Sequence, residues 1–116
     1  MTLLIQTNNL TWIKAYGRLP SKKIKNRGKW MTYIPIEYAN DVWKKIQIST
    51  EQGNLGYYSK MSAPILRSDR KTMVCVLCVY TYDCHDIKDI IRVREELRKL
   101  GFVKPISYQS KSILNI

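Results

Sequence analysis

The stretch MVCVLCVY, residues 73–80, constrains the fold more than any other part of the chain because it is an unbroken apolar run. Segments with turn signals lie on both sides of it. A short apolar run bounded in this way is typical of a strand that is covered on both of its faces. We therefore expect a sheet in which this segment is a central strand.

Residues 37–50, EYANDVWKKIQIST, have the periodicity of a helix. Their apolar side chains stand at positions 39, 42, 43 and 46, which share one helical face. The tryptophan of this stripe, Trp43, is therefore expected in the core. Gly53 or Gly56 is expected to end the helix because glycine adopts the left-handed turn that follows many helices.

Residues 86–101, DIKDIIRVREELRKLG, predict a second helix. Asp86 and Asp89 suit its positive amino-terminal end, and Gly101 suits its carboxyl-terminal end. The predicted buried stripe consists of Ile87, Ile90, Ile91, Leu97 and Leu100.

Shorter segments complete the element order. Further strands are expected at residues 10–17, 29–35, 57–62 and 106–110, while residues 63–71 are interpreted as a polar connection. The order strand, strand, helix, strand, strand, helix, strand predicts a single α+β domain, an antiparallel sheet with both helices on one face. The opposite face is then solvated, covered by loops or a binding surface.

A chain of 116 residues is long enough for one domain with one core. We assign the whole chain, residues 1–116, to that domain. It divides into a basic amino-terminal strand and loop, residues 1–27, and a core of strand, helix, strand, strand, helix and strand, residues 28–108.

The composition favours an internal protein without a cofactor or a metal. No apolar run approaches the roughly 20 residues that span a bilayer, and the opening MTLLIQTNNL does not resemble a signal peptide. Cys75 and Cys78 are three apart on a predicted strand and so face opposite ways. Cys84 and His85 lack a second cluster to complete a zinc site. We expect a cytoplasmic location and no membrane partner.

Positive charge is concentrated near the amino terminus. The net charge is +11, and residues 1–36 contain seven basic residues and no acidic one. Six of the seven lie between positions 18 and 29: Arg18, Lys22, Lys23, Lys25, Arg27 and Lys29. Such a cluster indicates a polyanionic partner, or contributes only solubility.

Four segments resemble a known family. They are GKW at 28–30, GNLGYYSKMS at 53–62, VCVLCVYTYD at 74–83 and DIIRVREELRKLG at 89–101. Together they resemble the basophilic-leukaemia-expressed-protein family, a domain of unknown function, over roughly residues 28–108. The resemblance implies the fold of the cap-binding translation initiation factors, a curved antiparallel sheet backed by helices. Members of the family also carry the label of a phosphothreonine lyase domain.

That label makes Lys60 a candidate catalytic base. Elimination of phosphate needs a base for the α-proton, an acid near the leaving oxygen and cations that hold the phosphate. A partly buried lysine suits the first role, and Arg67, Arg70 or Arg18 suits the third. A histidine on an early strand is what the resemblance implies for the acid, but the segment KWMTYI contains none. A solvated or structurally paired Lys60 is the simpler interpretation.

Basic and aromatic residues interleave in TWIKAYGR and KNRGKWMTY, which is a pattern of single-stranded nucleic-acid binding. Trp12, Tyr16 and Trp30 are the candidates for stacking on bases. A place in the core is the stronger reading for Trp30, whereas Trp12 is open to both. The six clustered cations, or Lys60 with Arg67 and Arg70, are the candidate phosphate ligands.

The preferred hypothesis is non-catalytic binding of a phosphate-bearing ligand, RNA or single-stranded DNA. A phosphothreonine-lyase-like enzyme that uses Lys60 and a protein-interaction or inhibitor module remain as alternatives.

Overall fold

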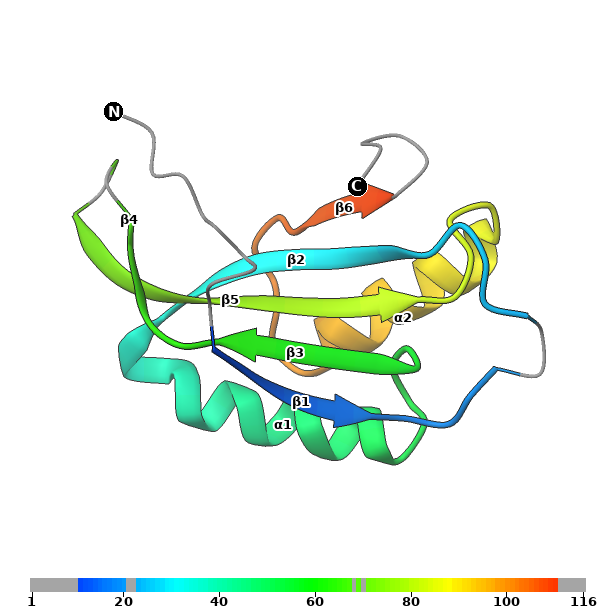
Figure 1. The fold of residues 1–116 in the computed structure, drawn as a ribbon, viewed down its shortest axis with the longest axis horizontal. Coiled ribbons are helices and arrows are strands. Elements are labelled where there is room, and N and C mark those ends of the chain that lie inside the picture. Colours follow the sequence, from blue (N-terminus) through cyan, green and yellow to red (C-terminus); the bar gives the residue numbers. More distant parts are fainter. Residues whose placement is uncertain (1–10, 21–22, 68, 70, 111–116) are drawn as a thin grey trace.

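The computed structural model describes residues 11–20, 23–67, 69 and 71–110, and Figure 1 shows how their elements are arranged. The elements in chain order are β1 (Trp12–Tyr16), β2 (Gly28–Pro35), the 3-10 helix η2 (Ile36–Tyr38), α1 (Ala39–Glu51), β3 (Tyr58–Ser62), β4 (Ile65–Arg67), β5 (Thr72–Thr81), α2 (Ile87–Lys99) and β6 (Ser107–Ser110).

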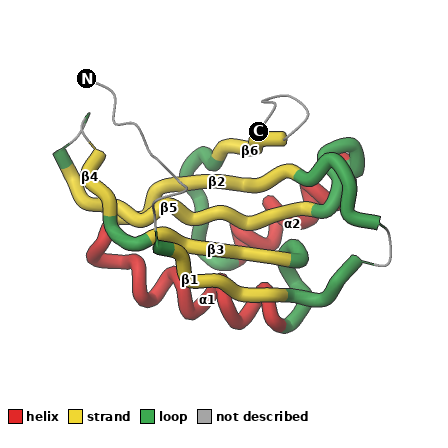
Figure 2. The backbone as a smooth tube through the Cα atoms, in the orientation of Figure 1, coloured by secondary structure: helices red, strands yellow, loops and turns green. Residues whose placement is uncertain are grey.

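All strand pairs in the sheet are antiparallel, and the strand order is β1-β3-β5-β2-β6, with β4 paired to β5 (Figure 2). The predicted central strand is confirmed: β5 lies between β3 and β2, and all its residues from Val74 to Val79 are buried. Because this strand is covered on both faces, its sequence shows no polar alternation.

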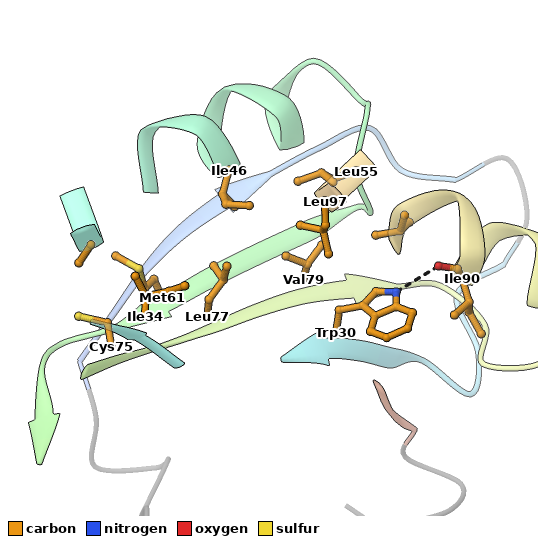
Figure 3. Close-up of a cluster of buried hydrophobic side chains, with 12 residues drawn as sticks. Trp30, Ile34, Ile46, Leu55, Met61, Cys75, Leu77, Val79, Ile90 and Leu97 are labelled. Carbon is orange, nitrogen blue, oxygen red and sulfur yellow. Dashed lines mark hydrogen bonds between the residues drawn. The ribbon is translucent and has the colours of Figure 1, made fainter. Parts of the chain in front are cut away.

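Both helices lie on the same face of the sheet, which confirms the α+β prediction (Figure 1). The core between them contains alternate side chains of β5, such as Leu77 and Val79, packed with Ile46 of α1 and Leu97 of α2 (Figure 3). Trp30 of β2 joins this core, and its indole Nε1 donates a hydrogen bond to the Ile90 carbonyl oxygen at 3.1 Å. Neither described helix has the length and apolar character to cross a membrane.

The ends of the helices follow the predicted signals. The Asp86 carboxylate caps α2 by accepting a hydrogen bond from the backbone N–H of Asp89. Gly53 and Gly101, which follow the two helices, have φ values of +81° and +106°. Residues with a Cβ rarely adopt such values, so glycine is favoured at both positions.

The predicted stripe of α2 is partly wrong. Ile90 and Leu97 are buried as expected, together with Val93, which the prediction omitted. Ile87 and Ile91 are instead 59% and 43% exposed. Ile91 lies about 100° around the helix from Ile90, outside the arc that meets the sheet, and Ile87 is the first residue of the helix.

The segment interpreted as a polar connection, residues 63–71, contains a strand. Residues 65–67 form β4, with Ile65 opposite Val74 and Arg67 opposite Thr72 of β5. A segment of three residues is too short to show an alternating pattern in the sequence. It becomes a strand because it pairs with residues 72–74 of β5.

Candidate functional site

The face of the sheet opposite the helices, here called the helix-free face, carries two rows of side chains that cross the strands. Strand register places one residue of each row on β1, β3, β5, β2 and β6 in turn. The tyrosine row is Tyr16, Tyr58, Tyr80, Lys29 and Gln109. The lysine row lies parallel to it, two residues away on every strand. Its members are Lys14, Lys60, Cys78, Met31 and Ser107.

The three tyrosines of the tyrosine row form a continuous stack. The ring centroids of Tyr16 and Tyr58 are 5.2 Å apart, and those of Tyr58 and Tyr80 are 5.1 Å apart. The interplanar angles are 26° and 30°, so the rings lie nearly parallel. Tyr58 thus has a ring on each side, whereas Tyr16 ends the stack at the β1 edge and is 65% exposed.

Cations lie among these rings. The Lys60 Nζ stands 4.0 Å from the centroid of the Trp12 ring and 5.8 Å from that of Tyr80. The Lys29 Nζ stands 5.7 Å from the Tyr80 centroid on the neighbouring strand. Lys14 lies opposite Lys60 in the register. The helix-free face therefore combines aromatic surface with several positive charges.

Burial shifts the pKa of Lys60, Tyr58, Tyr80 and Cys78. The pKa of Lys60 is lowered, chiefly because the amine is partly desolvated, and the charges of Lys29 and Lys14 lower it further. Desolvation also raises the pKa of Tyr58 and of Tyr80. Both phenols therefore stay protonated near neutral pH and can donate hydrogen bonds. Desolvation keeps the Cys78 thiol protonated as well, against the opposing charges of Lys29 and Lys60.

A hollow of about 310 Å³ opens where the tyrosine row reaches β2 and β6, and it is called the basic hollow below. It is lined by Arg27, Gly28, Lys29, Tyr58, Lys60, Tyr80, Gln109 and Ser110. Among the described residues, its lining thus includes three cationic side chains and no carboxylate.

The wall of the basic hollow needs a glycine at position 28. A Cβ on Gly28 would lie 2.1 Å from the Tyr108 hydroxyl oxygen, which itself is 2.6 Å from the Thr81 hydroxyl. No side chain can therefore be placed here without moving Tyr108. This close packing joins β2 to β6 beside the hollow.

The strands are positively charged as a group. None of the nine Asp and Glu residues of the chain lies in a strand, since all are in the helices, in η2 or in connecting segments. The strands carry Lys14, Lys29, Lys60 and Arg67. Among the described residues, no salt bridge involves the three lysines. Their field at the helix-free face is consequently not neutralised within the sheet.

The structure separates the clustered cations of the amino-terminal region. Arg27 and Lys29 reach the basic hollow. Lys23 and Lys25 line a different hollow, which also contains the carboxylates of Asp83 and Asp86. Arg18 lines a third, beside Asp89 and Arg92. The five of these cations that the structure describes therefore line three different hollows, and Lys22 lies outside the described residues.

Backbone hydrogen bonds explain this separation. The Lys25 N–H donates to the Tyr82 carbonyl oxygen at 3.0 Å, and the Cys84 N–H donates to the Asn26 carbonyl oxygen at 2.8 Å. These bonds hold the basic loop against the turn between β5 and α2, where acidic residues gather. Such long-range pairing leaves no local signal in the sequence.

Trp30 and Arg67 also lie away from the basic hollow. Trp30 is 8% exposed on the helix side of the sheet, so its ring is a core residue and the stacking prediction for it is not supported. Arg67 lies 4.4 Å from the Tyr33 ring centroid and pairs with Asp69 at 2.8 Å. Arg70 lies outside the described residues.

Lys60 and Arg67 are too far apart to share one phosphate. Lys60 is opposite Cys78 on β5, whereas Arg67 is opposite Thr72, six residues away on the same strand. Six residues of strand span about 20 Å. The two side chains therefore belong to different parts of the sheet.

Lys14, Tyr58, Tyr80 and Gln109 are members of the face that sequence reasoning did not select. Tyr58 and Lys60 are two apart on one strand, and the period-two rule places such residues on the same side. The period-two rule could therefore have selected Tyr58 from Lys60. It could also have selected Lys14, which lies two residues from both Trp12 and Tyr16. Tyr80 had no such signal, because it closes a run in which every residue is apolar or aromatic.

Asp83, Cys84 and His85 place three potential metal ligand atoms within 4.8 Å of one another. The Asp83 Oδ1 atom already accepts a hydrogen bond from the His85 backbone N–H at 3.0 Å. Lys23 and Lys25 line the hollow beside this turn, and their charges oppose the binding of a cation. The turn is accordingly a poor candidate for a metal site.

Comparison with known proteins identifies the family. No curated protein matches the chain. The model of the family described as basophilic leukemia-expressed protein Bles03 matches residues 17–115, which begin just after β1 and include every later described strand and helix. A match of this extent covers most of the domain. The chain belongs to the basophilic leukemia-expressed protein Bles03 family.

Proposed function

We propose that this protein binds RNA or single-stranded DNA, without catalysis, on the helix-free face of its sheet. The observation that carries the proposal is the tyrosine stack beside Lys14, Lys29 and Lys60 on strands that contain no carboxylate. Single-stranded nucleic acid is held by the same two ingredients, a basic surface for the phosphates and aromatic rings for the bases.

Stacking would use the ends of the aromatic assembly. Both sides of Tyr58 are occupied by other tyrosines, so this ring serves as support. The exposed Tyr16 ends the stack at the β1 edge and offers a ring to an incoming base. Trp12 is the second candidate, on the same face and strand. Each stacked base contributes about 1 to 3 kcal/mol.

Phosphate contacts would come from the lysines and from Arg27. The two rows are about 7 Å apart along the strands, a spacing close to the repeat of an extended nucleic-acid backbone. Lys60 lies between Trp12 and Tyr80, so a phosphate bound there would be adjacent to a stacked base. Neutralising three or four phosphates of a single strand gives a slope of log affinity against log salt of about −2 to −3.

The element order supports the fold that the family resemblance implies. That resemblance implies the fold of the cap-binding initiation factors, in which helices back one face of a curved antiparallel sheet. Here both helices cover one face and the aromatic and basic side chains lie on the other. The proposed ligand therefore occupies the side of the sheet that the helices leave open.

The test is the affinity of the intact chain for short fluorescent RNA and DNA single strands at several salt concentrations. We expect tighter binding at low salt, with Lys60→Gln lowering the salt slope by about 0.7 to 1. The matched control is Lys44→Gln, the same charge change on an exposed residue of α1, which lies on the opposite face. Affinity that ignores salt, or equal loss in both variants, contradicts the proposal.

Lyase chemistry is a second candidate because the pKa of Lys60 is lowered by burial. In that reaction the neutral amine would remove the α-proton of a phosphothreonine, and the C–O bond to phosphate would break to leave a dehydrated residue. The roughly 20 Å between Lys60 and Arg67 opposes it. Incubation with a phosphothreonine peptide, followed by mass spectrometry for loss of phosphoric acid, tests the reaction. If neither assay gives a signal, a protein-interaction module is the better interpretation.

A further inference from the structure

We infer that the basic hollow binds the terminal phosphate monoester of a nucleic-acid strand, so that the protein recognises strand ends. The inference rests on the proposed function and adds the class of ligand. It follows from three properties of the hollow: its charge, its hydrogen-bond donors and its position at one end of the tyrosine row.

The charge of the hollow exceeds what one internal phosphate needs. Arg27, Lys29 and Lys60 all line it, and no carboxylate of the described part of the chain does. An internal phosphodiester carries a single negative charge, whereas a phosphate monoester carries about −1.5 to −2 at neutral pH. Three cations around a space of about 310 Å³ therefore match the monoester better.

The donors of the hollow suit a group with three terminal oxygens. Tyr58 and Tyr80 present protonated phenols, Gln109 presents an amide, and the three cations add charged donors. A phosphodiester has only two non-bridging oxygens to accept such bonds. A monoester has three, each a stronger acceptor because of the additional charge.

Position supplies the third argument. Along the tyrosine row the rings occupy β1, β3 and β5, whereas Lys29 and Gln109 occupy β2 and β6. Within this one row the three rings thus lie on neighbouring strands, and Lys29 and Gln109 follow them rather than alternating with them. An internal segment presents phosphates on both sides of every base, but the phosphate at a strand end lies beyond the last base. The row therefore fits a strand whose bases lie toward β1 and whose end enters the hollow.

The test compares five-nucleotide strands of one sequence that carry a 5′-phosphate, a 3′-phosphate or hydroxyls at both ends. Affinity is measured by competition with a labelled strand. We expect one phosphorylated form to bind about tenfold more tightly than the hydroxyl form, which is the effect of one added charge-assisted hydrogen bond. The better of the two phosphorylated forms identifies the end that is recognised.

Three variants assign the preference to the hollow. Lys29→Gln is expected to reduce the tenfold preference to less than threefold, and Lys29→Arg is expected to restore it. Tyr16→Ala, at the other end of the row, is expected to weaken all three strands equally and to keep the preference. Thermal unfolding of each variant shows whether the fold is intact. If Lys29→Gln is unstable, Lys29→Arg still tests whether a positive charge at this position supports the preference.

The outcomes separate the two proposals. Equal binding of phosphorylated and hydroxyl strands overturns the strand-end inference and leaves the proposed function in place. Absence of binding to all strands overturns both. Tighter binding of a phosphothreonine peptide than of any strand also overturns the inference. That result would assign phosphopeptide recognition to the hollow.

Discussion

Replacing Gly56 by alanine should destabilise the protein by forcing β3 and β5 apart where the candidate site begins. A Cβ at position 56 would lie 1.7 Å from the Tyr80 carbonyl oxygen and 2.8 Å from its carbonyl carbon. Real Cβ contacts are longer than 3.0 Å, so the two backbones must separate by more than about 1.3 Å. Because the obstructing atom is backbone, no side-chain rotation relieves the clash.

We expect the free energy of unfolding to fall by about 3 kcal/mol, the upper part of the range for overpacked sites. With a urea slope of about 1.5 kcal/mol per molar, the unfolding midpoint falls by roughly 2 M. The same shift moves Tyr80 away from Tyr58, so affinity for single strands should fall as well. Urea denaturation followed by tryptophan fluorescence measures the first effect.

Gly101→Ala is the matched control. No atom lies within 4 Å of a Cβ built there, so its cost comes only from the φ of +106°, about 1 to 2 kcal/mol. It should leave nucleic-acid binding unchanged because it follows α2, away from the tyrosine row. A Gly56→Ala midpoint equal to that of the wild type, or above that of Gly101→Ala, would refute the argument from backbone contact.

Three further predictions concern the core, a helix cap and pH. Trp30→Phe removes the indole hydrogen bond to the Ile90 carbonyl and should cost about 1 to 2 kcal/mol of unfolding free energy in urea denaturation. Asp86→Ala removes the cap on the Asp89 N–H together with the hydrogen bond that the Tyr82 hydroxyl donates to Asp86, and should cost at least about 1 kcal/mol, with loss of helical circular dichroism on heating. The hydrogen bond to Asp86 raises the pKa of Tyr82 to about 12 from its ordinary 10, so the stabilisation is full below pH 10 and is lost as the pH rises toward 12. Tyr82→Phe should flatten this decline in stability, and an unchanged pH profile would contradict the assignment.

The location of the candidate site could be predicted only in part. Trp12, Tyr16, Lys29 and Lys60 were selected from the sequence, and all four lie on the helix-free face. The expectation that the amino-terminal cations form one site was not met, because hydrogen bonds to the β5–α2 turn direct Lys25 toward acidic residues. A charge count along the chain contains no information on such long-range pairing.

The sequence by itself determined both helices, the strands other than β4 and most of the apolar side of each element. The continuous run of β5, the helical spacing in α1, the Asp86 cap and the glycines after both helices are local features, and local features decide secondary structure. The order of these elements along the chain also predicted that both helices lie on one face of the sheet.

Only the tertiary structure decided which residues meet. Tyr16, Tyr58 and Tyr80 are separated by 42 and 22 positions in the chain, and the register of three strands brings them into one stack. The same register brings Lys29 and Lys60 to one hollow beside Gln109. Register is set by the burial of whole strand faces, so it is a property of the assembled sheet and not of any single segment.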